Sequence, residues 1–447
     1  MKVVVSSLAV LAIGVLLMNS PLAEENKIFP FKINQSTLEN GLRVVAVPFD
    51  SPGLVAYYTV VRTGSRNEVE PGHSGFAHFF EHMMFRGTER YSTEKYHEVL
   101  KVMGADSNAF TTDDWTCYHA VFSSSELEKM IELEADRFMN LKYNEEGFKT
   151  EAGAVLGEYN KNYSNPMAAM YERLRDEAFV AHTYKHTTMG FLADIKDMPN
   201  QYAYSLKFFS RYYRPENCII VVVGDFDQAK LLQWVKNYYG RWTRGDYQVE
   251  IPQEPPQTAE KLVRMAWKNR TLPYLMIGYH VPEFDERTQT MPALDILSQM
   301  VFSQSAPLFQ KLVLQKQMVE FIGGSAQDRR DPALFIVSTR IKSAQDIDAV
   351  RSEIDAAMEE AKSKPVDAGR LAEIKSNMRY SLAMRMNNPD SVANTLGHFL
   401  ELTGNPDSIN RVYAMYDRVT AEDLMAVAKK YFTRENRTVV ILTEEQK

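Results

Sequence analysis

The chain has 447 residues and a formal net charge of -7, with 45% hydrophobic and 24% charged residues. These values are ordinary for a soluble globular protein, and the length suggests two or three domains. A nucleic-acid-binding protein usually carries a basic patch or a high pI, and the sequence has neither, which argues against that class of function.

The N-terminus carries one lysine, an apolar run from Val3 to Met18, and then small residues. This pattern is typical of a secretory signal peptide, so we expect residues 1–23 to be one, with cleavage near Ala23, and the mature chain to be periplasmic or secreted. The alternative is an uncleaved membrane anchor, although the run is shorter than the ~18 residues expected of a span. Elsewhere the sequence shows no apolar stretch long enough to cross a bilayer.

Cys117 and Cys218 are the two cysteines of the chain. In an oxidising compartment they could form one bridge, but they are too few for a disulfide framework or a thiolate zinc site.

The first predicted elements are two strands, at residues 41–49 and 53–64, rich in β-branched and aromatic residues and bounded by glycine and proline. A helix from about residue 75 to 86 follows, with Ser74 expected to cap its start and Gly87 to end it. Ser92 then begins another helix, which stops at Gly104. Residues 107–122 predict two strands joined by a turn at Thr112–Asp114.

Two more helices follow these strands. Ser125 and Glu128 form a capping-box pattern for a helix that runs to about Asn140. Asn144 begins a long helix that reaches about Tyr163.

A repeat links the two halves of the chain. "RYYRPENCIIVVVGDF" (211–226) returns as "KYFTRENRTVVILTEE" (430–445), with Tyr212 matching Tyr431 at an offset of 219 residues. A constant offset of about half the chain indicates two copies of one α/β unit. Residues 248–261 between them hold three prolines and no helical period, as in an extended linker.

The most informative motif is "HFFEH". In a helix, His78 and His82 project from one face one turn apart, so both imidazoles can bind one metal ion, and Glu81 shares that face. H-x-x-E-H is the reversed order of the H-E-x-x-H zinc helix. The alternative is that His78 and His82 are buried core histidines and Glu81 a solvated charge.

Two histidines leave a tetrahedral zinc ion short of at least one protein ligand. Glu151 and Glu158 lie two turns apart on the next long helix and point the same way. Either could reach the metal, while the other could orient a ligand or a water. With zinc polarising a carbonyl and acidifying a water, Glu81 would act as the general base of peptide hydrolysis.

At this point the sequence resembles the insulinase/pitrilysin family of inverted-zincin metallopeptidases, from about residue 36 to 443. "HFFEH" matches the family motif, and Glu158 follows His82 by 76 residues, the spacing of that family's third ligand. The resemblance implies one Zn²⁺ per chain held by His78, His82 and Glu158, with Glu151 supporting the site.

The resemblance also implies an α+β fold of two homologous α/β-roll domains, each an antiparallel sheet backed by helices. We expect an N-terminal zinc-binding domain at 24–247, a linker at 248–262 and a C-terminal homologous domain without metal at 263–447. The chain resembles the half-size class of the family, which includes the mitochondrial processing peptidases, where two subunits enclose a chamber. Substrate would add a strand at the edge formed by Asn108, Ala109, Phe110 and Thr111.

The sequence departs from the family pattern at two positions of the second domain, and this departure suggests a partner subunit. Half-size members usually carry an Arg and a Tyr seven residues apart in the second domain, which help to hold substrate and the oxyanion. Here Val313 and Glu320 stand at those positions. We therefore expect a heterodimer whose partner supplies the Arg/Tyr pair; a homodimer or a monomer is the alternative.

Taken together, the sequence predicts an exported zinc endopeptidase acting on peptides or unfolded segments. Two rivals from other classes stay open: a non-catalytic assembly subunit of a larger complex, and a chaperone-like peptide binder.

Overall fold

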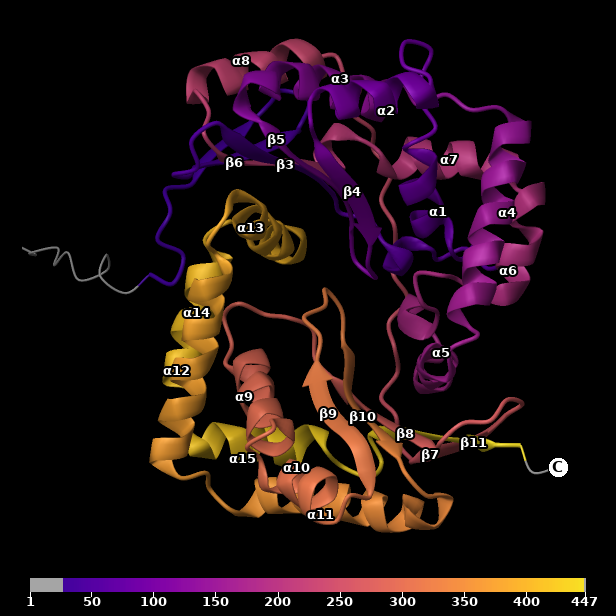
Figure 1. Ribbon diagram of the computed structural model, residues 1–447, viewed down its shortest axis with the longest axis vertical. Helices are drawn as coiled ribbons and strands as arrows, with labels where there is room; N and C mark the ends of the chain where they lie inside the picture. Colours follow the sequence, from indigo (N-terminus) through magenta and orange to yellow (C-terminus); the bar gives the residue numbers. More distant parts are fainter. Residues whose placement is uncertain (1–26, 446–447) are drawn as a thin grey trace, which may run out of the picture.

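The computed structural model describes residues 27–445, so the predicted signal peptide lies outside the described residues. Each half of the chain builds one sheet, and the two sheets lie at opposite ends of the molecule (Figure 1). The first sheet has the strand order β1-β2-β6-β3-β5-β4. Its strands are β1 (Asn34–Thr37), β2 (Arg43–Pro48), β3 (Leu54–Val61), β4 (Asp106–Thr111), β5 (Thr116–Ser123) and β6 (Cys218–Gly224).

The second sheet repeats this plan with one strand fewer, in the order β7-β11-β8-β10-β9. Its strands are β7 (Lys261–Trp267), β8 (Tyr274–Val281), β9 (Val319–Ala326), β10 (Ala333–Ile341) and β11 (Arg437–Glu444). Both sheets are mainly antiparallel, as expected, but each contains one parallel pair, β2 with β6 and β7 with β11.

The internal repeat found in the sequence is confirmed by matching hydrogen bonds. Asn217 precedes β6 and donates from Nδ2 to the carbonyl of Tyr212, at 2.8 Å. Asn436 precedes β11 and makes the same bond to the carbonyl of Tyr431, also at 2.8 Å. Each asparagine therefore fixes the turn from a helix into an inner strand of its own sheet.

Helices cover both faces of each sheet. Those of the first half are α1 (Phe76–Met83), α2 (Thr93–Val102), α3 (Leu127–Asn140), α4 (Glu145–Asn162), α5 (Pro166–Ala178), α6 (Leu192–Asp197), α7 (Tyr202–Tyr212) and α8 (Gln228–Tyr239). Those of the second half are α9 (Thr290–Phe302), α10 (Pro307–Phe309), α11 (Ile347–Ser363), α12 (Ala368–Arg385), α13 (Pro389–Thr403), α14 (Ser408–Arg418) and α15 (Ala421–Tyr431). None of the helices within residues 27–445 combines the length and apolar character needed to span a membrane.

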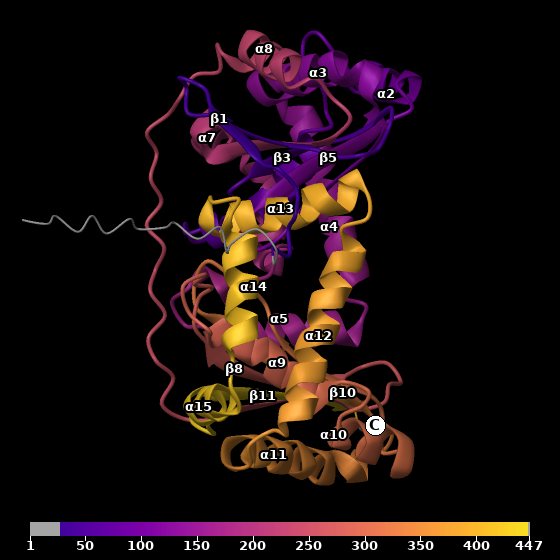
Figure 2. The same cartoon turned by 90° about the vertical axis from the view of Figure 1, so that its left-hand side faces the viewer.

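The two halves exchange one helix each. α5 packs on β8 and β11 of the second sheet, where Leu174 joins a core with Met276 and Val440. In return α13 packs on β3 and β6 of the first sheet, where Leu396 and Val60 share a core. Residues 242–260, which contain no helix or strand, run along the outside between the two ends (Figure 2). Each half therefore completes the hydrophobic core of the other.

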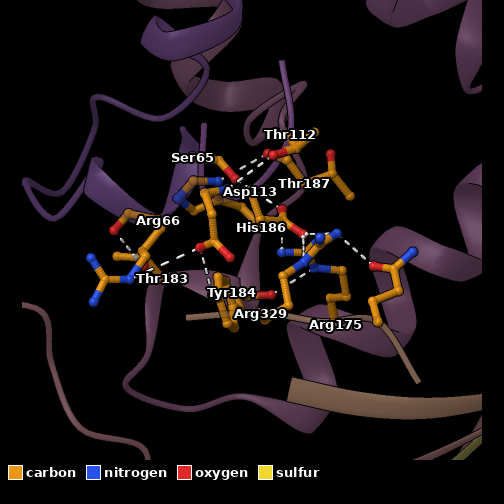
Figure 3. Close-up of polar contacts among 12 residues, drawn as sticks. Ser65, Arg66, Thr112, Asp113, Arg175, Thr183, Tyr184, His186, Thr187 and Arg329 are labelled. Carbon is orange, nitrogen blue, oxygen red and sulfur yellow. Dashed lines mark hydrogen bonds and ion pairs between the residues drawn. The ribbon is translucent and has the colours of Figure 1, made fainter. Parts of the chain in front are cut away.

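A buried charged network also joins the halves, at the turn between β4 and β5 (Figure 3). Asp113 in this turn accepts hydrogen bonds from Ser65 Oγ (3.0 Å) and from Nε of Arg329 in the β9–β10 loop (3.0 Å). It also pairs with Arg175 of α5 at 2.9 Å. Removing one partner of a buried ion pair typically costs several kcal/mol, ~3–5 kcal/mol. The network therefore holds the end of edge strand β4 firmly against the second half.

The strand register excludes a bond between the two cysteines. Cys117 of β5 lies opposite Val60 of β3, whereas Cys218 of β6 lies opposite the next residue, Val61, from the other side of β3. Because successive residues of a strand point to opposite faces, the two thiols face different cores with a strand between them. Both are free and buried.

Two of the predicted helix caps are confirmed and two are wrong. Ser92 and Asn144 cap α2 and α4 as predicted, by accepting hydrogen bonds from the backbone of Lys95 and Gly147. The prediction that Ser74 caps α1 is wrong, because Gly75 is the N-cap and the Ser74 hydroxyl donates to Asp194 instead (2.6 Å). The capping box before α3 is also wrong, because residues 124–126 form a 3₁₀ turn and the helix begins at Leu127.

Candidate metal centre

Helix α1 carries His78 and His82 on one face, and its opposite face is apolar. Phe76, Phe79, Phe80 and Met83 are buried in the core under the first sheet. The residue just before the helix, the N-cap Gly75, has a φ of +89°, which is accessible to glycine at little cost. The apolar stripe therefore determines which way the remaining face, with its histidines, points.

The start of α1 is capped by a distant side chain. Glu68 accepts hydrogen bonds from the backbone N–H groups of Gly75 and Ala77, each at 2.7 Å. A carboxylate at this position satisfies two orphan donors and complements the helix dipole. This role could not be read from the sequence, because Glu68 precedes the helix by a loop.

Helix α4 brings Glu158 to the histidines. Its buried residues Phe148, Ala152 and Val155 pack in the same core as α1, and the two helices lie near each other (Figure 1). Glu158 Oε2 lies 3.6 Å from His78 Nε2 and 3.4 Å from His82 Nε2. Among the described residues, these three form the one group of at least three side chains whose ligand atoms could hold a metal ion, all within 4.8 Å of one another.

The spacing of these atoms fits zinc. Ligands at 2.0–2.1 Å from a tetrahedral zinc ion lie ~3.3–3.4 Å from each other. The two distances from Glu158 to the imidazoles are within a few tenths of an ångström of that value. Two imidazole nitrogens and one carboxylate oxygen are also a donor set typical of catalytic zinc, with a fourth position left for water or substrate.

Glu151 does not join this group but orients one of its members. Its Oε1 lies 2.8 Å from His82 Nδ1, which leaves His82 Nε2 to face Glu158. Its Oε2 accepts a hydrogen bond from Arg86 Nε. Of the two roles left open for Glu151 and Glu158, the geometry favours support for Glu151 and ligation for Glu158.

Electrostatics favours a neutral imidazole at His78 and a charged carboxylate at Glu151. Burial, aided by neighbouring His82, lowers the pKa of His78 to about 3. The hydrogen bond with Glu151 raises the pKa of His82. Burial alone would raise the pKa of Glu151, but the hydrogen bonds from His82 and Arg86 outweigh it and lower that pKa. A neutral His78 presents a lone pair, which is the form that binds metal.

Glu81 stands beside the group, tied to the edge of the sheet. Its Oε2 accepts a hydrogen bond from Thr111 Oγ1 of β4 at 2.6 Å. Burial raises the pKa of Glu81, with the Thr111 hydrogen bond opposing the shift. This contact brings the candidate general base to the strand predicted to accept substrate.

Residues Asn108–Thr111 lie in β4, the outermost strand of the first sheet, which pairs with β5 on one side. Thr112 N–H bonds to the Trp115 carbonyl across the turn, so by alternation Ala109 points its backbone away from β5. The Ala109 N–H is instead satisfied by the side chain of Asn108, at 2.9 Å. The outer edge of β4 has no strand partner among the described residues, and a strand added there would replace the contact from Asn108.

The positions at which the resemblance led us to expect an Arg/Tyr pair lie in the second half of the chain. Val313 is in the π-helical segment Gln310–Gln315, which follows α10. Glu320 is on edge strand β9 and accepts a hydrogen bond from Arg340 at 2.9 Å. Neither side chain at these two positions can donate to an oxyanion.

Two models of known protein families match the chain. The model described as "Insulinase (Peptidase family M16)" matches residues 45–191, and "Peptidase M16 inactive domain" matches residues 202–378. The chain belongs to the M16 family of zinc peptidases, and its length and two-domain fold place it in the half-size class.

Two relatives illustrate the likeness. The zinc protease PqqE of Helicobacter pylori is 29% identical over 413 residues, which cover 91% of each chain. The β subunit of the mitochondrial processing peptidase of Bos taurus is 30% identical over 222 residues, 49% of this chain and 44% of that one.

Two solved structures share the fold. A protease from Helicobacter pylori has a TM-score of 0.87 at 28% identity, covering 92% of this chain and 99% of that one. The periplasmic protease PqqL from Escherichia coli has a TM-score of 0.75 at 17% identity, covering 93% of this chain but 48% of that chain. The present chain therefore matches about half of the longer Escherichia coli protein.

Proposed function

We propose that this chain is a zinc metalloendopeptidase, with His78, His82 and Glu158 as zinc ligands and Glu81 as general base. The observation that carries the proposal is the set of ligand-atom distances, 3.4 and 3.6 Å, between two imidazoles and one carboxylate with Glu81 next to them. A zinc ion bound there supplies Lewis acidity, which polarises a scissile carbonyl and acidifies a water.

Other residues of the chain would transfer the proton, orient a ligand and hold the substrate. Glu81 takes the proton from the attacking water and passes it to the leaving amine. Glu151 keeps the His82 ring oriented through Nδ1. The outer edge of β4 at Asn108–Thr111 holds the substrate backbone as an added strand, which gives affinity with little sequence preference. Peptides and unfolded segments are therefore the substrates that this edge suits.

The assembly that we propose is a heterodimer around a closed chamber. Val313 and Glu320 leave the chain without the Arg/Tyr pair of its family, so a homologous partner would supply it. Two comparisons support this arrangement: one relative is named as the beta subunit of a peptidase, and the Escherichia coli neighbour is about twice as long as the part that this chain matches. A homodimer of this chain is the alternative assembly.

For location we propose the periplasm or the exterior of the cell. The support is the leader at residues 1–23, together with a structural neighbour described as a periplasmic protease. Fractionation of cells that express the full chain, with and without residues 1–23, tests this proposal. Retention of the full chain in the cytoplasm would contradict it.

The proposed base is tested by Glu81→Gln. This variant should keep zinc, measured by metal analysis, but lose at least ~10²-fold in kcat on a quenched peptide, because the proton acceptor is gone. His82→Ala should lose both metal and activity. Glu146→Gln, which removes an exposed carboxylate from α4, is the matched control and should change neither. Full turnover by Glu81→Gln would refute the assignment.

The second candidate is a non-catalytic assembly or peptide-binding subunit. The absent Arg/Tyr pair favours it, while the intact ligand set argues against it. A purified chain that binds peptide but neither binds zinc nor cleaves the peptide, alone or with its partner, would establish this reading.

A further inference from the structure

The last residue of β4, Thr111, links the edge strand to the candidate general base. Its hydroxyl oxygen lies 2.6 Å from Glu81 Oε2, a distance typical of a hydroxyl that donates to a carboxylate. A carboxylate has two oxygens, and each can accept a hydrogen independently. With Oε2 engaged by Thr111, Oε1 is the oxygen of Glu81 that is left to take a proton from water.

The hydrogen bonds around Thr111 direct its hydroxyl hydrogen to Glu81. Thr116 lies directly opposite Thr111 on β5, and the two hydroxyl oxygens are 3.4 Å apart. The buried Thr116 hydroxyl donates to the carbonyl of Thr63 at 3.0 Å, so its single hydrogen is already used. A carboxylate oxygen at 2.6 Å is a better acceptor for the Thr111 hydrogen than a hydroxyl oxygen at 3.4 Å. Glu81 is therefore the partner that Thr111 holds.

The main chain that follows Thr111 is fixed by a tight turn. The Thr112 N–H bonds to the Trp115 carbonyl at 2.8 Å, and the Thr112 hydroxyl accepts from the Trp115 N–H at 3.2 Å. The next residue, Asp113, belongs to the buried charged network that joins the two halves (Figure 3). Because the turn is held on both sides, the Thr111 side chain has a defined position from which to orient Glu81.

The backbone of Thr111 points away from β5, towards the open edge of the sheet. Thr112 and Trp115 form a hydrogen-bonded pair, and such pairs alternate with unbonded pairs along an antiparallel ladder. Thr111 therefore belongs to an unbonded pair, as Ala109 does, and its N–H and C=O face the side on which a peptide strand would add. One residue thus presents its backbone to the substrate and its hydroxyl to the candidate base.

We propose that Thr111 is a positioning residue that couples substrate pairing at β4 to the orientation of the general base. The added strand bonds to the Thr111 backbone, while the Thr111 hydroxyl holds one oxygen of Glu81 so that the other can meet the attacking water. This inference rests on the proposed peptidase function and deepens it. Thr111 acts through Glu81 and needs no contact with the reacting atoms.

The test separates the hydroxyl of Thr111 from its shape. T111V keeps the size and the β-branching of threonine but removes the hydroxyl, whereas T111S keeps the hydroxyl and removes the methyl group. We expect kcat of T111V on a quenched peptide to fall about 10- to 100-fold, the scale of a hydrogen bond to a charged group. KM should change by less than about twofold, because backbone pairing at β4 is retained. T111S should keep kcat within about threefold of the wild type.

A purely structural role of Thr111 predicts the reverse order of the two variants. Valine suits a β-strand better than serine, so T111V would then match the wild type and T111S would be the weaker enzyme. Both variants should bind as much zinc as the wild type in metal analysis, since no ligand is changed. T37V makes the same substitution at an exposed threonine of β1, at the opposite edge of the sheet, and should change neither kcat nor KM.

Wild-type kcat in T111V, or an equal loss in T111S, would overturn the inference. Loss of zinc from T111V would also overturn it, because the hydroxyl would then support the metal centre and not the base. If thermal unfolding shows that T111V does not fold, T111A also lacks the hydroxyl and should show the same loss of kcat. Failure of the proposed function gives a different result: the wild-type chain then cleaves no peptide, and the inference falls with it.

Discussion

At the scale of single residues, the contact between Glu151 and His82 leads to a prediction about zinc affinity. The 2.8 Å contact to His82 Nδ1 fixes the ring so that Nε2 faces the other ligands. Glu151→Gln should weaken zinc affinity by ~10–100-fold without abolishing binding, because the three ligands remain. Competition with a chelator of known affinity measures this.

Glu158→Gln provides the contrast within the same helix, since it removes a ligand and should lose stoichiometric zinc. If Glu151→Gln loses zinc entirely while Glu158→Gln retains it, the two roles are reversed.

Asp295 makes the stability of the protein depend on pH. Its pKa is raised to about 8 in the folded chain and is near ~3.9 when unfolded, so between these values the native state binds more protons. Stability should therefore fall as pH rises from about 4 to 8. Asp295→Asn cannot ionise and still accepts from Tyr416, so it should unfold at a higher temperature than wild type at pH 8.

Thermal unfolding at pH 5 and pH 8 tests this, with Asp348→Asn as control. If the difference in unfolding temperature between Asp295→Asn and the wild type is no larger at pH 8 than at pH 5, Asp295 is not the group responsible.

At the scale of elements, the free edge of β4 makes a prediction about substrates. Backbone N-methylation of a peptide removes one donor and blocks strand pairing at that residue. We expect methylation at alternate residues, those whose N–H faces β4, to lower kcat/KM by tenfold or more, and methylation between them to be tolerated. A peptide series methylated at one residue at a time would show the alternation. Uniform effects along the peptide would contradict strand addition.

The same scale shows what the sequence could and could not predict. The placement of His78, His82, Glu151 and Glu158 followed from helical spacing and family resemblance, because each pair sits within one helix. The cap by Glu68 and the Asp113–Arg329 contact join residues far apart in the chain, so no local pattern reveals them. Ser74 failed as a cap because Asp194, 120 residues away, takes its hydroxyl.

At the scale of the whole molecule, the exchange of α5 and α13 was invisible in the sequence, since the repeat predicts two equal units but not which sheet each helix covers. The exchange makes the halves interdependent. A protease site inserted after Gln248, which is exposed in the extended segment, should be cut without loss of packing. The two pieces should still co-elute in size-exclusion chromatography. Their separation under native conditions would contradict the exchange.

The account as a whole depends on one metal ion shared by two imidazoles and a carboxylate. Metal analysis of the purified chain, combined with X-ray absorption at the zinc edge, tests this most directly. We expect about one zinc per chain with two nitrogen and at least one carboxylate oxygen neighbours at ~2.0–2.2 Å, and no zinc in His82→Ala. A chain without stoichiometric zinc after loading, or one that holds zinc equally well in His82→Ala, would contradict the proposed centre.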